Sequence, residues 1–241
     1  MRDEGEVNVP GIFYGIGVGS GDPELLTVKA CKVLSRLDVL VAPVTAEERE
    51  SIAYNIVRDF LNPNAQVLFR RFPMSDDPAI WQESAVSVAN EICTLVCGGK
   101  KVGFVTLGDP MFYSTYVYLL QELKRLELDT ETIPGVSSVT AACSKTGLSL
   151  AERNERIAIL PAAYGLEDME PILGNFETVV LLKVKGDCSR LVEILEKAGM
   201  KENAVFVSRL GLDNERIVYD LDEIRGQNVN YLSLIIARKK R

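Results

Sequence analysis

Residues 12–23 read Ile-Phe-Tyr-Gly-Ile-Gly-Val-Gly-Ser-Gly-Asp-Pro. Residues 12–19 have the apolar, β-branched character of a buried strand that runs into a glycine-rich turn. Asp22 and Pro23 then open a predicted helix, because proline is tolerated in the first helical turn. The stretch therefore predicts a strand, a turn and a helix, which is how a βαβ unit begins.

The same order recurs twice along the chain. Residues 102–107 predict a buried strand that ends at Gly108-Asp109-Pro110, and Thr130–Ile133 predicts another that ends at Pro134-Gly135. Helices are predicted after these turns, at 113–126 and 137–146. Because parallel strands end at one edge of a sheet, we expect the three turns to lie side by side where α/β proteins bind ligands. Glycine there lets the backbone approach a ligand closely, although such turns also use glycine and proline for geometry alone.

The remaining pattern predicts a second domain. Before Pro134 we expect further strands at 38–43 and 67–72, helices at 51–61 and 79–97, and a loop at 73–78. After Leu148 we expect one strong helix at 188–198 and strands at 157–160, 178–184, 204–208, 215–219 and 231–237. The sequence therefore predicts two α/β domains. Residues 1–134 would hold a mainly parallel sheet and residues 135–241 a mixed one.

Composition narrows the class of protein. The chain has 241 residues, of which 47% are hydrophobic and 25% charged, the balance of a folded protein with a core. Its net charge of −7 argues against general nucleic-acid binding. No apolar segment approaches the ~20 residues of a membrane span, and no signal peptide is visible. We expect a soluble, cytoplasmic protein.

Five cysteines and the absence of histidine limit the chemistry. Cys93 and Cys97 share one face of the predicted helix 79–97, but zinc's usual partners, histidine and a CxxC pair, are missing. We therefore predict no metal site and treat the cysteines as small buried residues of a reducing compartment. Without histidine, the commonest general base and every Ser-His or Cys-His nucleophile pair are excluded.

The glycine turns fit neither common phosphate-binding pattern. The dinucleotide fingerprint needs glycine where this chain has Ser20 or Asp22, and no Gly-Lys-Ser/Thr follows. Asp22, Glu24 and Asp109 crowd the turns without a lysine, which is unfavourable for a pyrophosphate. A ligand with hydroxyls and positive charge, such as S-adenosylmethionine, fits them better.

The motifs resemble those of the tetrapyrrole methylases. Residues 15–27, 105–115 and 133–138 are similar to three successive motifs of that family. Within it, residues 72–75, 113–116, 159–162, 182–184 and 231–234 resemble the branch that methylates carbon 20 of precorrin-2 or cobalt-factor II. The resemblance covers nearly the whole chain. It implies a C-methyltransferase of cobalamin biosynthesis that has two α/β domains, holds S-adenosylmethionine in the cleft between them and forms a homodimer.

The resemblance also implies roles for individual residues. The cofactor-binding positions would be Val18, Gly108, Asp109, Phe112, Ser137, Ser138, Lys183, Ser208 and Leu232. Lys183 departs from the family's usual apolar residue, so we expect it to contact the cofactor through its backbone. Tyr113 and Ser114, in the segment that favours carbon 20, would contact the substrate.

The expected reaction requires little general acid–base catalysis by the protein. A methyl group passes in line from a sulfonium to an electron-rich meso carbon, so the protein mainly aligns the reactants and excludes water. No catalytic residue is assigned, and Tyr113, Asp109 and Glu24 are candidates for the later proton removal by location only. A substrate with eight carboxylates needs local cations, and the candidates are Arg70, Arg71, Arg153 and Lys185.

Two alternatives stay open at this point. The uroporphyrinogen methylase and the diphthamide-forming methylase share the glycine motifs. A nucleotide- or dinucleotide-binding regulatory module is the alternative from another class, supported only by Asp38, about twenty residues past the first turn.

Overall fold

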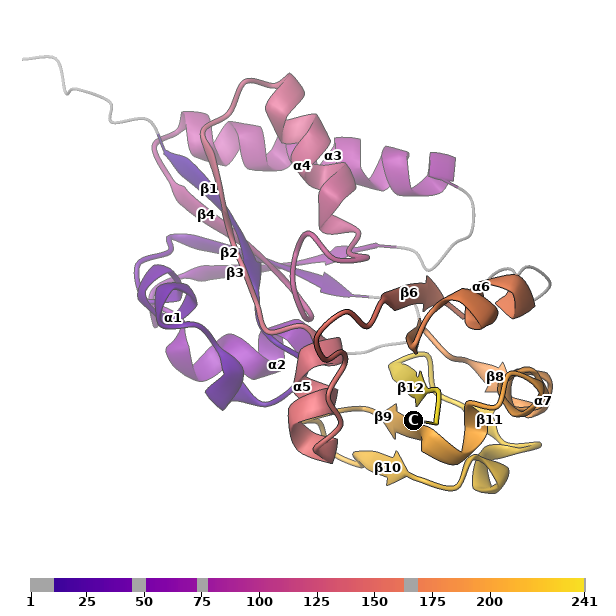
Figure 1. Cartoon of the computed structure of the whole chain (residues 1–241). Coiled ribbons are helices and arrows are strands. Elements are labelled where there is room, and N and C mark those ends of the chain that lie inside the picture. The colour runs from indigo at the N-terminus through magenta and orange to yellow at the C-terminus, as the bar shows by residue number, and fades with distance from the viewer. Residues whose placement is uncertain (1–10, 45–50, 73–77, 163–168, 241) are drawn as a thin grey trace, which may run out of the picture. The chain divides into compact units, whose positions relative to one another are not determined.

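The computed structural model describes residues 11–44, 51–72, 78–162 and 169–240. The chain divides into two compact units, Met1–Ser137 and Ser138–Arg241 (Figure 1). Residues 73–77 of the predicted loop at 73–78, and most of the segment 72–75, lie outside the described residues. No helix among those described is long and apolar enough to cross a membrane.

The first unit contains a five-stranded parallel sheet in the order β3-β2-β4-β1-β5. The strands are β1 (Ile12–Gly17), β2 (Val39–Val44), β3 (Gln66–Arg71), β4 (Lys101–Thr106) and β5 (Thr130–Ile133). The chain passes from β1 to β2 and β3, returns to β4, and then crosses to β5 on the far side of β1. The strand order therefore reverses at β1 and β4, and ligands of open α/β sheets bind beyond the carboxyl ends at such a point.

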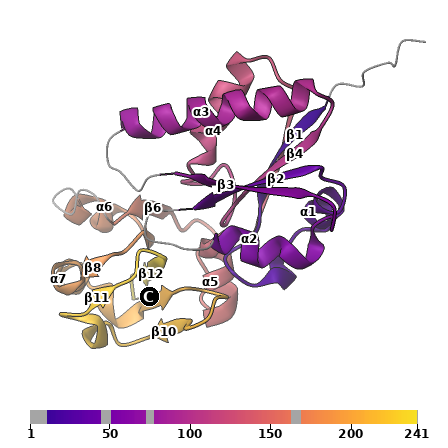
Figure 2. The ribbon, with the colours of Figure 1, turned by 180° about the vertical axis from the view of Figure 1, so that it is seen from behind.

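Helices cover both faces of this sheet (Figures 1 and 2). On one face lie α3 (Pro78–Cys97) and α4 (Tyr116–Arg125), and on the other lie α1 (Val28–Leu34), α2 (Ile52–Val57) and the 3-10 turn η2 (Arg58–Phe60). Successive strand residues pack against the helices on opposite faces of the sheet. Phe104 belongs to the apolar cluster under α3 and α4, and Val105 belongs to the cluster under α1 and α2. This is the burial expected of a parallel sheet.

The helix predicted from Asp22 begins later than expected. Asp22 accepts a hydrogen bond from Glu24 N–H at 2.9 Å and caps only a 3-10 turn, η1 (Pro23–Leu25). The hydroxyl of Thr27 then accepts the Ala30 N–H at 3.1 Å, so α1 starts at the next residue, Val28. A threonine N-cap, rather than the proline, sets the start of this helix.

The second unit contains a mixed sheet in the order β10-β9-β12-β7-β6. Its strands are β6 (Ile157–Pro161), β7 (Thr178–Leu182), β9 (Ala204–Ser208), β10 (Arg216–Val218) and β12 (Ser233–Arg238). The β6–β7 pair is parallel and the other three pairs are antiparallel. A separate two-stranded ladder joins β8 (Gly186–Asp187) to β11 (Asn228–Val229). A parallel and a mixed sheet, each with helices, confirm the predicted fold class.

The helical elements among the described residues of this unit are α5 (Ser138–Thr146), α6 (Met169–Asn175), α7 (Ser189–Lys197) and the 3-10 turns η4 (Lys201–Asn203) and η5 (Leu221–Ile224). Leu173 of α6 and Leu195 of α7 pack in one cluster with Leu181 and Phe206 of the sheet. The sequence did not predict α6, because Pro171 and a glycine interrupt its seven residues and weaken the helical pattern.

Candidate functional site

The three predicted turns lie against one another at the carboxyl edge of the parallel sheet. Gly19 and Gly108 form an antiparallel bridge, in which Gly108 N–H donates to the Gly19 carbonyl at 2.7 Å. Asp109 Oδ2 accepts a hydrogen bond from Gly135 N–H at 3.1 Å. The second turn is thus bonded to both the first and the third, which confirms that they meet.

Two of the turn glycines make room for neighbouring backbone, which is the geometric role that the sequence left open beside ligand approach. A Cβ atom on Gly17 would lie 2.5 Å from the Gly135 nitrogen and 2.7 Å from the Gly108 oxygen. A Cβ atom on Gly135 would collide with the same Gly108 oxygen. Gly15, in β1, leaves space for the ring of Tyr116. These residues are glycines because the turns interlock.

Gly108 differs from these glycines. Its φ of 66° lies in the left-handed region, and a Cβ atom there would have no neighbour within 4 Å. Nearby in the first turn, the Ser20 hydroxyl is buried and has no hydrogen-bond partner among the described residues. An unsatisfied buried polar group costs about 1–3 kcal/mol. A bare backbone in open space and an unsatisfied hydroxyl are together suited to a polar ligand.

Asp109 is a brace between turns. Its Oδ1 accepts from Met111 N–H at 2.9 Å, while its Oδ2 accepts from Gly135 N–H. A carboxylate has about four acceptor sites, so two remain for a ligand. Asp109 can therefore hold the second and third turns and still contact a bound molecule.

The loop after Asp109 presents exposed apolar side chains. Met111 is 57% exposed and Tyr113 is 47% exposed, and the rings of Phe112 and Tyr113 meet edge to face at 5.1 Å. Tyr113 has a φ of 52°, so α4 begins at Tyr116 and not at Tyr113 as predicted. A bulky residue in the left-handed region costs roughly 1–3 kcal/mol, and such strain clusters at functional sites.

Hydroxyl groups anchor this loop to the strand ends. The Ser114 and Thr106 hydroxyls are 2.9 Å apart, and Ser114 Oγ also accepts the Tyr116 N–H at 3.2 Å. The Tyr116 hydroxyl lies 2.6 Å from that of Thr132 on β5. Ser114, predicted to contact substrate, is thus bonded within the unit. Sequence reasoning missed Thr106 and Tyr116, since neither stands out before the turns are placed together.

Val18 lies beneath the first turn. Its side chain has no exposed surface, it packs in the cluster under α1 and α2, and its N–H donates to the Thr106 carbonyl at 3.0 Å. This differs from its predicted place in the cofactor pocket, because a fully buried residue supports the turn from below. Ser137 ends the first unit, and Ser138 is the first residue of α5 in the second.

The predicted second-unit residues come together at one end of the mixed sheet. Lys183 follows β7, Ser208 ends β9 and Leu232 precedes β12. The register pairs Ser208 with Ser233, and their hydroxyls are 2.9 Å apart and buried. Lys183 has a φ of 58°, and its ammonium lies 5.6 Å from the Tyr231 ring centroid. Sequence reasoning missed Ser233, which becomes visible only through this pairing.

Arg70 and Arg71 do not form a joint site. Successive strand residues point to opposite faces, so only one of them faces α3. Arg70 donates from Nε to Glu91 of α3 at 2.6 Å and pairs a second time through Nη2. These bonds hold the pKa of Glu91 below its ordinary value. Arg71 is exposed on the side of Phe69.

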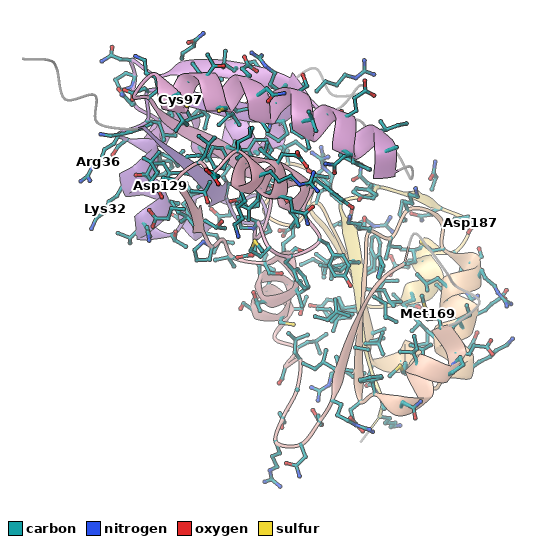
Figure 3. The ribbon with its side chains drawn as sticks, turned by 90° about the horizontal axis from the view of Figure 1, so that it is seen from above. Lys32, Arg36, Cys97, Asp129, Met169 and Asp187 are labelled. Carbon is teal, nitrogen blue, oxygen red and sulfur yellow. The ribbon has the colours of Figure 1, made fainter. Side chains whose placement is uncertain are left out.

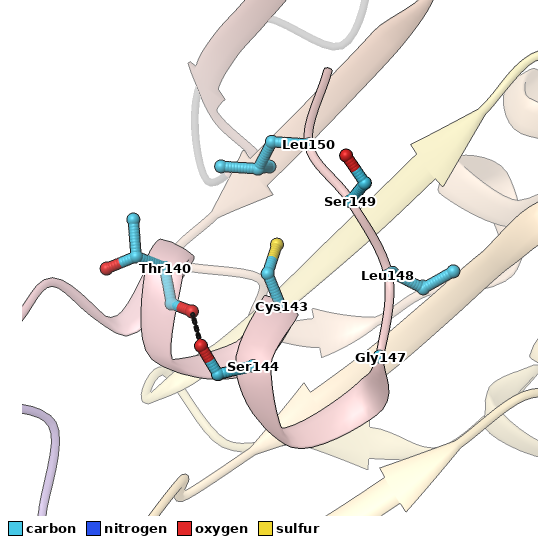
Figure 4. A pocket seen from close by; sticks show the side chains of 7 residues that line it. All are labelled: Thr140, Cys143, Ser144, Gly147, Leu148, Ser149 and Leu150. Carbon is cyan, nitrogen blue, oxygen red and sulfur yellow. Dashed lines mark hydrogen bonds between the residues drawn. The ribbon is translucent and has the colours of Figure 1, made fainter. Parts of the chain in front are cut away.

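A hollow of about 390 Å³ lies in the second unit, and none of the predicted site residues lines it (Figure 4). Ser144 Oγ donates to the Thr140 carbonyl across its wall at 3.1 Å. It is lined by Thr140, Cys143, Ser144, Gly147, Leu148, Ser149 and Leu150. None of these side chains is charged, and the nearby Arg238 guanidinium is bonded to the Ser149 carbonyl and to Glu155.

Comparison with known proteins agrees with this architecture. The family model described as Tetrapyrrole (Corrin/Porphyrin) Methylases matches residues 13–224. The cobalt-precorrin-2 C(20)-methyltransferase of Salmonella typhimurium is 34% identical over 95% of this chain and 97% of its own length. The probable cobalt-precorrin-2 C(20)-methyltransferase of Methanocaldococcus jannaschii is also 34% identical, over 94% and 95%. A precorrin-2 C(20)-methyltransferase from Sinorhizobium is 29% identical, over 94% and 95%.

Solved structures share the fold. A cobalt precorrin-4 methyltransferase superposes with a TM-score of 0.72 at 26% identity, covering 94% of each chain. The uroporphyrin-III C-methyl transferase from Thermus thermophilus, solved with S-adenyl homocysteine, gives a TM-score of 0.70 at 24% identity, over 95% of this chain and 97% of that one. With three interlocked turns at the sheet edge and a family match across 13–224, the chain belongs to the tetrapyrrole (corrin/porphyrin) methylases.

Proposed function

We propose that the chain is an S-adenosylmethionine-dependent C-methyltransferase of cobalamin biosynthesis that methylates carbon 20 of a precorrin-2-type tetrapyrrole. The observation that carries the proposal is the nearly full-length match, at 34% identity, to two relatives named for this reaction on the cobalt-containing substrate. The lower identity of 29% to the metal-free counterpart from Sinorhizobium favours cobalt-factor II over precorrin-2.

The local chemistry of the first unit fits this cofactor. The backbone at Gly108 faces open space, and the unsatisfied Ser20 hydroxyl can bond to a ribose or amino group. Asp22 and Glu24 place negative charge in the first turn, which favours a sulfonium over a phosphate. When bound, S-adenosylmethionine supplies an activated methyl group.

The proposed cofactor contacts combine these features with the positions that the family resemblance implies. In the first unit they are the Gly108 backbone, the free acceptor sites of Asp109, the Phe112 ring and Ser137, with Val18 supporting the first turn. In the second unit we propose Ser138, Lys183, Ser208 and Leu232. Lys183 acts through its backbone, because its ammonium already lies over the Tyr231 ring.

Substrate binding draws on a different set of side chains. Met111 and Tyr113 offer an exposed apolar surface suited to the face of a macrocycle. Arg71 provides a positive charge for a carboxylate, whereas Glu91 already compensates Arg70. The protein's task is to hold the acceptor carbon in line and exclude water, which needs no histidine. The proposal includes a cytoplasmic location and a homodimer, as the family resemblance implies.

Anaerobic incubation with cobalt-factor II, and separately with precorrin-2, tests the reaction. With methyl-labelled S-adenosylmethionine, we expect label at carbon 20 and faster turnover of the cobalt-containing substrate. Label at another carbon, or methylation of uroporphyrinogen alone, overturns the assignment. Calorimetric titration is expected to show binding of S-adenosylhomocysteine and none of NAD, and the reverse result would support the dinucleotide-binding alternative.

A further inference from the structure

Two cysteines on α3 lie outside the site described so far. Cys93 and Cys97 are one helical turn apart, and their Sγ atoms are 3.9 Å apart. Cys93 is half-buried and Cys97 is exposed, near the C-terminal end of α3 (Figure 3). The expectation that all five cysteines are buried is therefore wrong, since only Cys188 is fully buried. The pair is open to a reagent from solution.

The last turn of α3, which carries the pair, is held by several backbone hydrogen bonds. Gly99 N–H donates to the Val96 carbonyl at 2.9 Å, and Lys100 N–H donates to the Leu95 carbonyl at 3.1 Å. With Gly99 at a φ of 82°, these two bonds form a Schellman motif. Gly11 N–H adds a third bond, to Val96, at 3.1 Å. Unwinding the last turn of α3 would break all three.

This geometry opposes a disulfide but suits a bridging atom. Cβ atoms four residues apart on a helix are about 5–6 Å apart, whereas a disulfide needs roughly 3.5–4.5 Å. A disulfide would therefore require the turn to unwind. Two bonds of about 2.3 Å from sulfur to one thiophilic atom span up to ~4.6 Å, so a bridge fits the 3.9 Å separation without moving the backbone.

The pair offers two ligands and no more. Across the described segments there is no group of three or more His, Cys, Asp or Glu side chains able to hold a metal ion. A closed zinc site needs four ligands. We propose that Cys93 and Cys97 form a chelating dithiol for a thiophilic ion or metalloid that two sulfurs satisfy, the class that a monosubstituted trivalent arsenical represents. This site is independent of the methyl transfer proposed above.

The chemistry balances without an oxidant. Phenylarsine oxide reacts with two thiols to form two As–S bonds, and its oxygen leaves as water with both thiol protons while arsenic stays trivalent. Burial and the contact with Cys97 raise the pKa of the Cys93 thiol, so it enters this condensation protonated at neutral pH. The product is a ring that closes through the two Sγ atoms.

Intact-mass spectrometry of the full chain tests the site with phenylarsine oxide as the probe. We expect one phenylarsenic group per chain that survives washing with 2-mercaptoethanol and is removed by ethanedithiol. Cys93→Ser and Cys97→Ser should each abolish the wash-resistant adduct, with unchanged circular dichroism, while the matched half-buried control Cys143→Ser should keep it. A wash-resistant adduct that persists in Cys97→Ser, or none on the unaltered chain, overturns the proposal.

Discussion

The carboxylate of Asp109 accepts a hydrogen bond at 3.1 Å from the backbone N–H of Gly135, 26 residues further along the chain. This contact joins the turn after β4 to the turn after β5, on either side of β1. Because Asp109 also accepts the Met111 N–H, one side chain sets both the spacing of two turns and the path of the loop between β4 and α4.

Replacing Asp109 with asparagine tests this brace. An amide has one acceptor oxygen, so one of the two backbone N–H groups loses its partner and faces an NH₂ donor instead. We expect S-adenosylhomocysteine affinity to fall about tenfold, the effect of losing one hydrogen bond to a charged group. Calorimetric titration measures this, with Asp59→Asn as the exposed control. Unchanged affinity in Asp109→Asn would show that the brace does not shape the binding site.

Gly108 and Gly226 form a matched pair for testing the open position. Both have a φ of 66°, and a Cβ atom on either would have no neighbour within 4 Å. Alanine at each should therefore cost about 1–2 kcal/mol from backbone conformation alone. Only Gly108→Ala should also lose S-adenosylhomocysteine binding, because its Cβ would occupy the space we assign to the ligand. Equal binding by the two variants in titration would remove Gly108 from the site.

Sequence patterns predict where the turns lie but not what each residue in them touches. Alternating strands and helices are enough to bring the three turns to one sheet edge, since parallel strands share direction. The same pattern cannot show that Gly17 makes room for Gly135, because that contact depends on how two distant loops pack. Likewise, Ser208 meets Ser233 only through an antiparallel register that no local signal fixes. Arg70 and Arg71 were both predicted to pair with substrate carboxylates, and only the contact of Arg70 with Glu91 separates their roles.

Tyr113 links backbone strain to substrate binding. Tyr113→Gly removes the left-handed penalty of roughly 1–3 kcal/mol, partly offset by glycine's greater freedom when unfolded, so stability should hold or rise. The same change removes an exposed ring, and we expect KM for the tetrapyrrole to rise about tenfold while S-adenosylhomocysteine affinity stays unchanged. Steady-state kinetics and thermal melts measure the two effects. Tyr219→Gly, at a tyrosine of the second unit that is 62% exposed against 47% for Tyr113, should leave KM unchanged. A KM unaffected by Tyr113→Gly contradicts the assignment.

Replacement of the two neighbouring arginines of β3 should affect different properties, KM in one case and stability in the other. Arg71→Ala should raise KM for the carboxylate-rich substrate without lowering stability, because Arg71 is exposed on the side away from α3. Arg70→Ala should lower stability instead, because it leaves Glu91 without its guanidinium partner.

The pKa of Glu91 is lowered in the folded state, so the stabilisation by the Arg70–Glu91 pair is complete above the ordinary value of 4.5 and is lost as pH falls through the lowered value. Urea denaturation of the native chain and of Arg70→Ala should therefore differ at pH 7 and converge in acid. The pair is about one-third exposed, so we expect a difference of about 1 kcal/mol or less at pH 7. A difference that grows in acid, or a larger effect of Arg70→Ala on KM than of Arg71→Ala, would reverse the two roles.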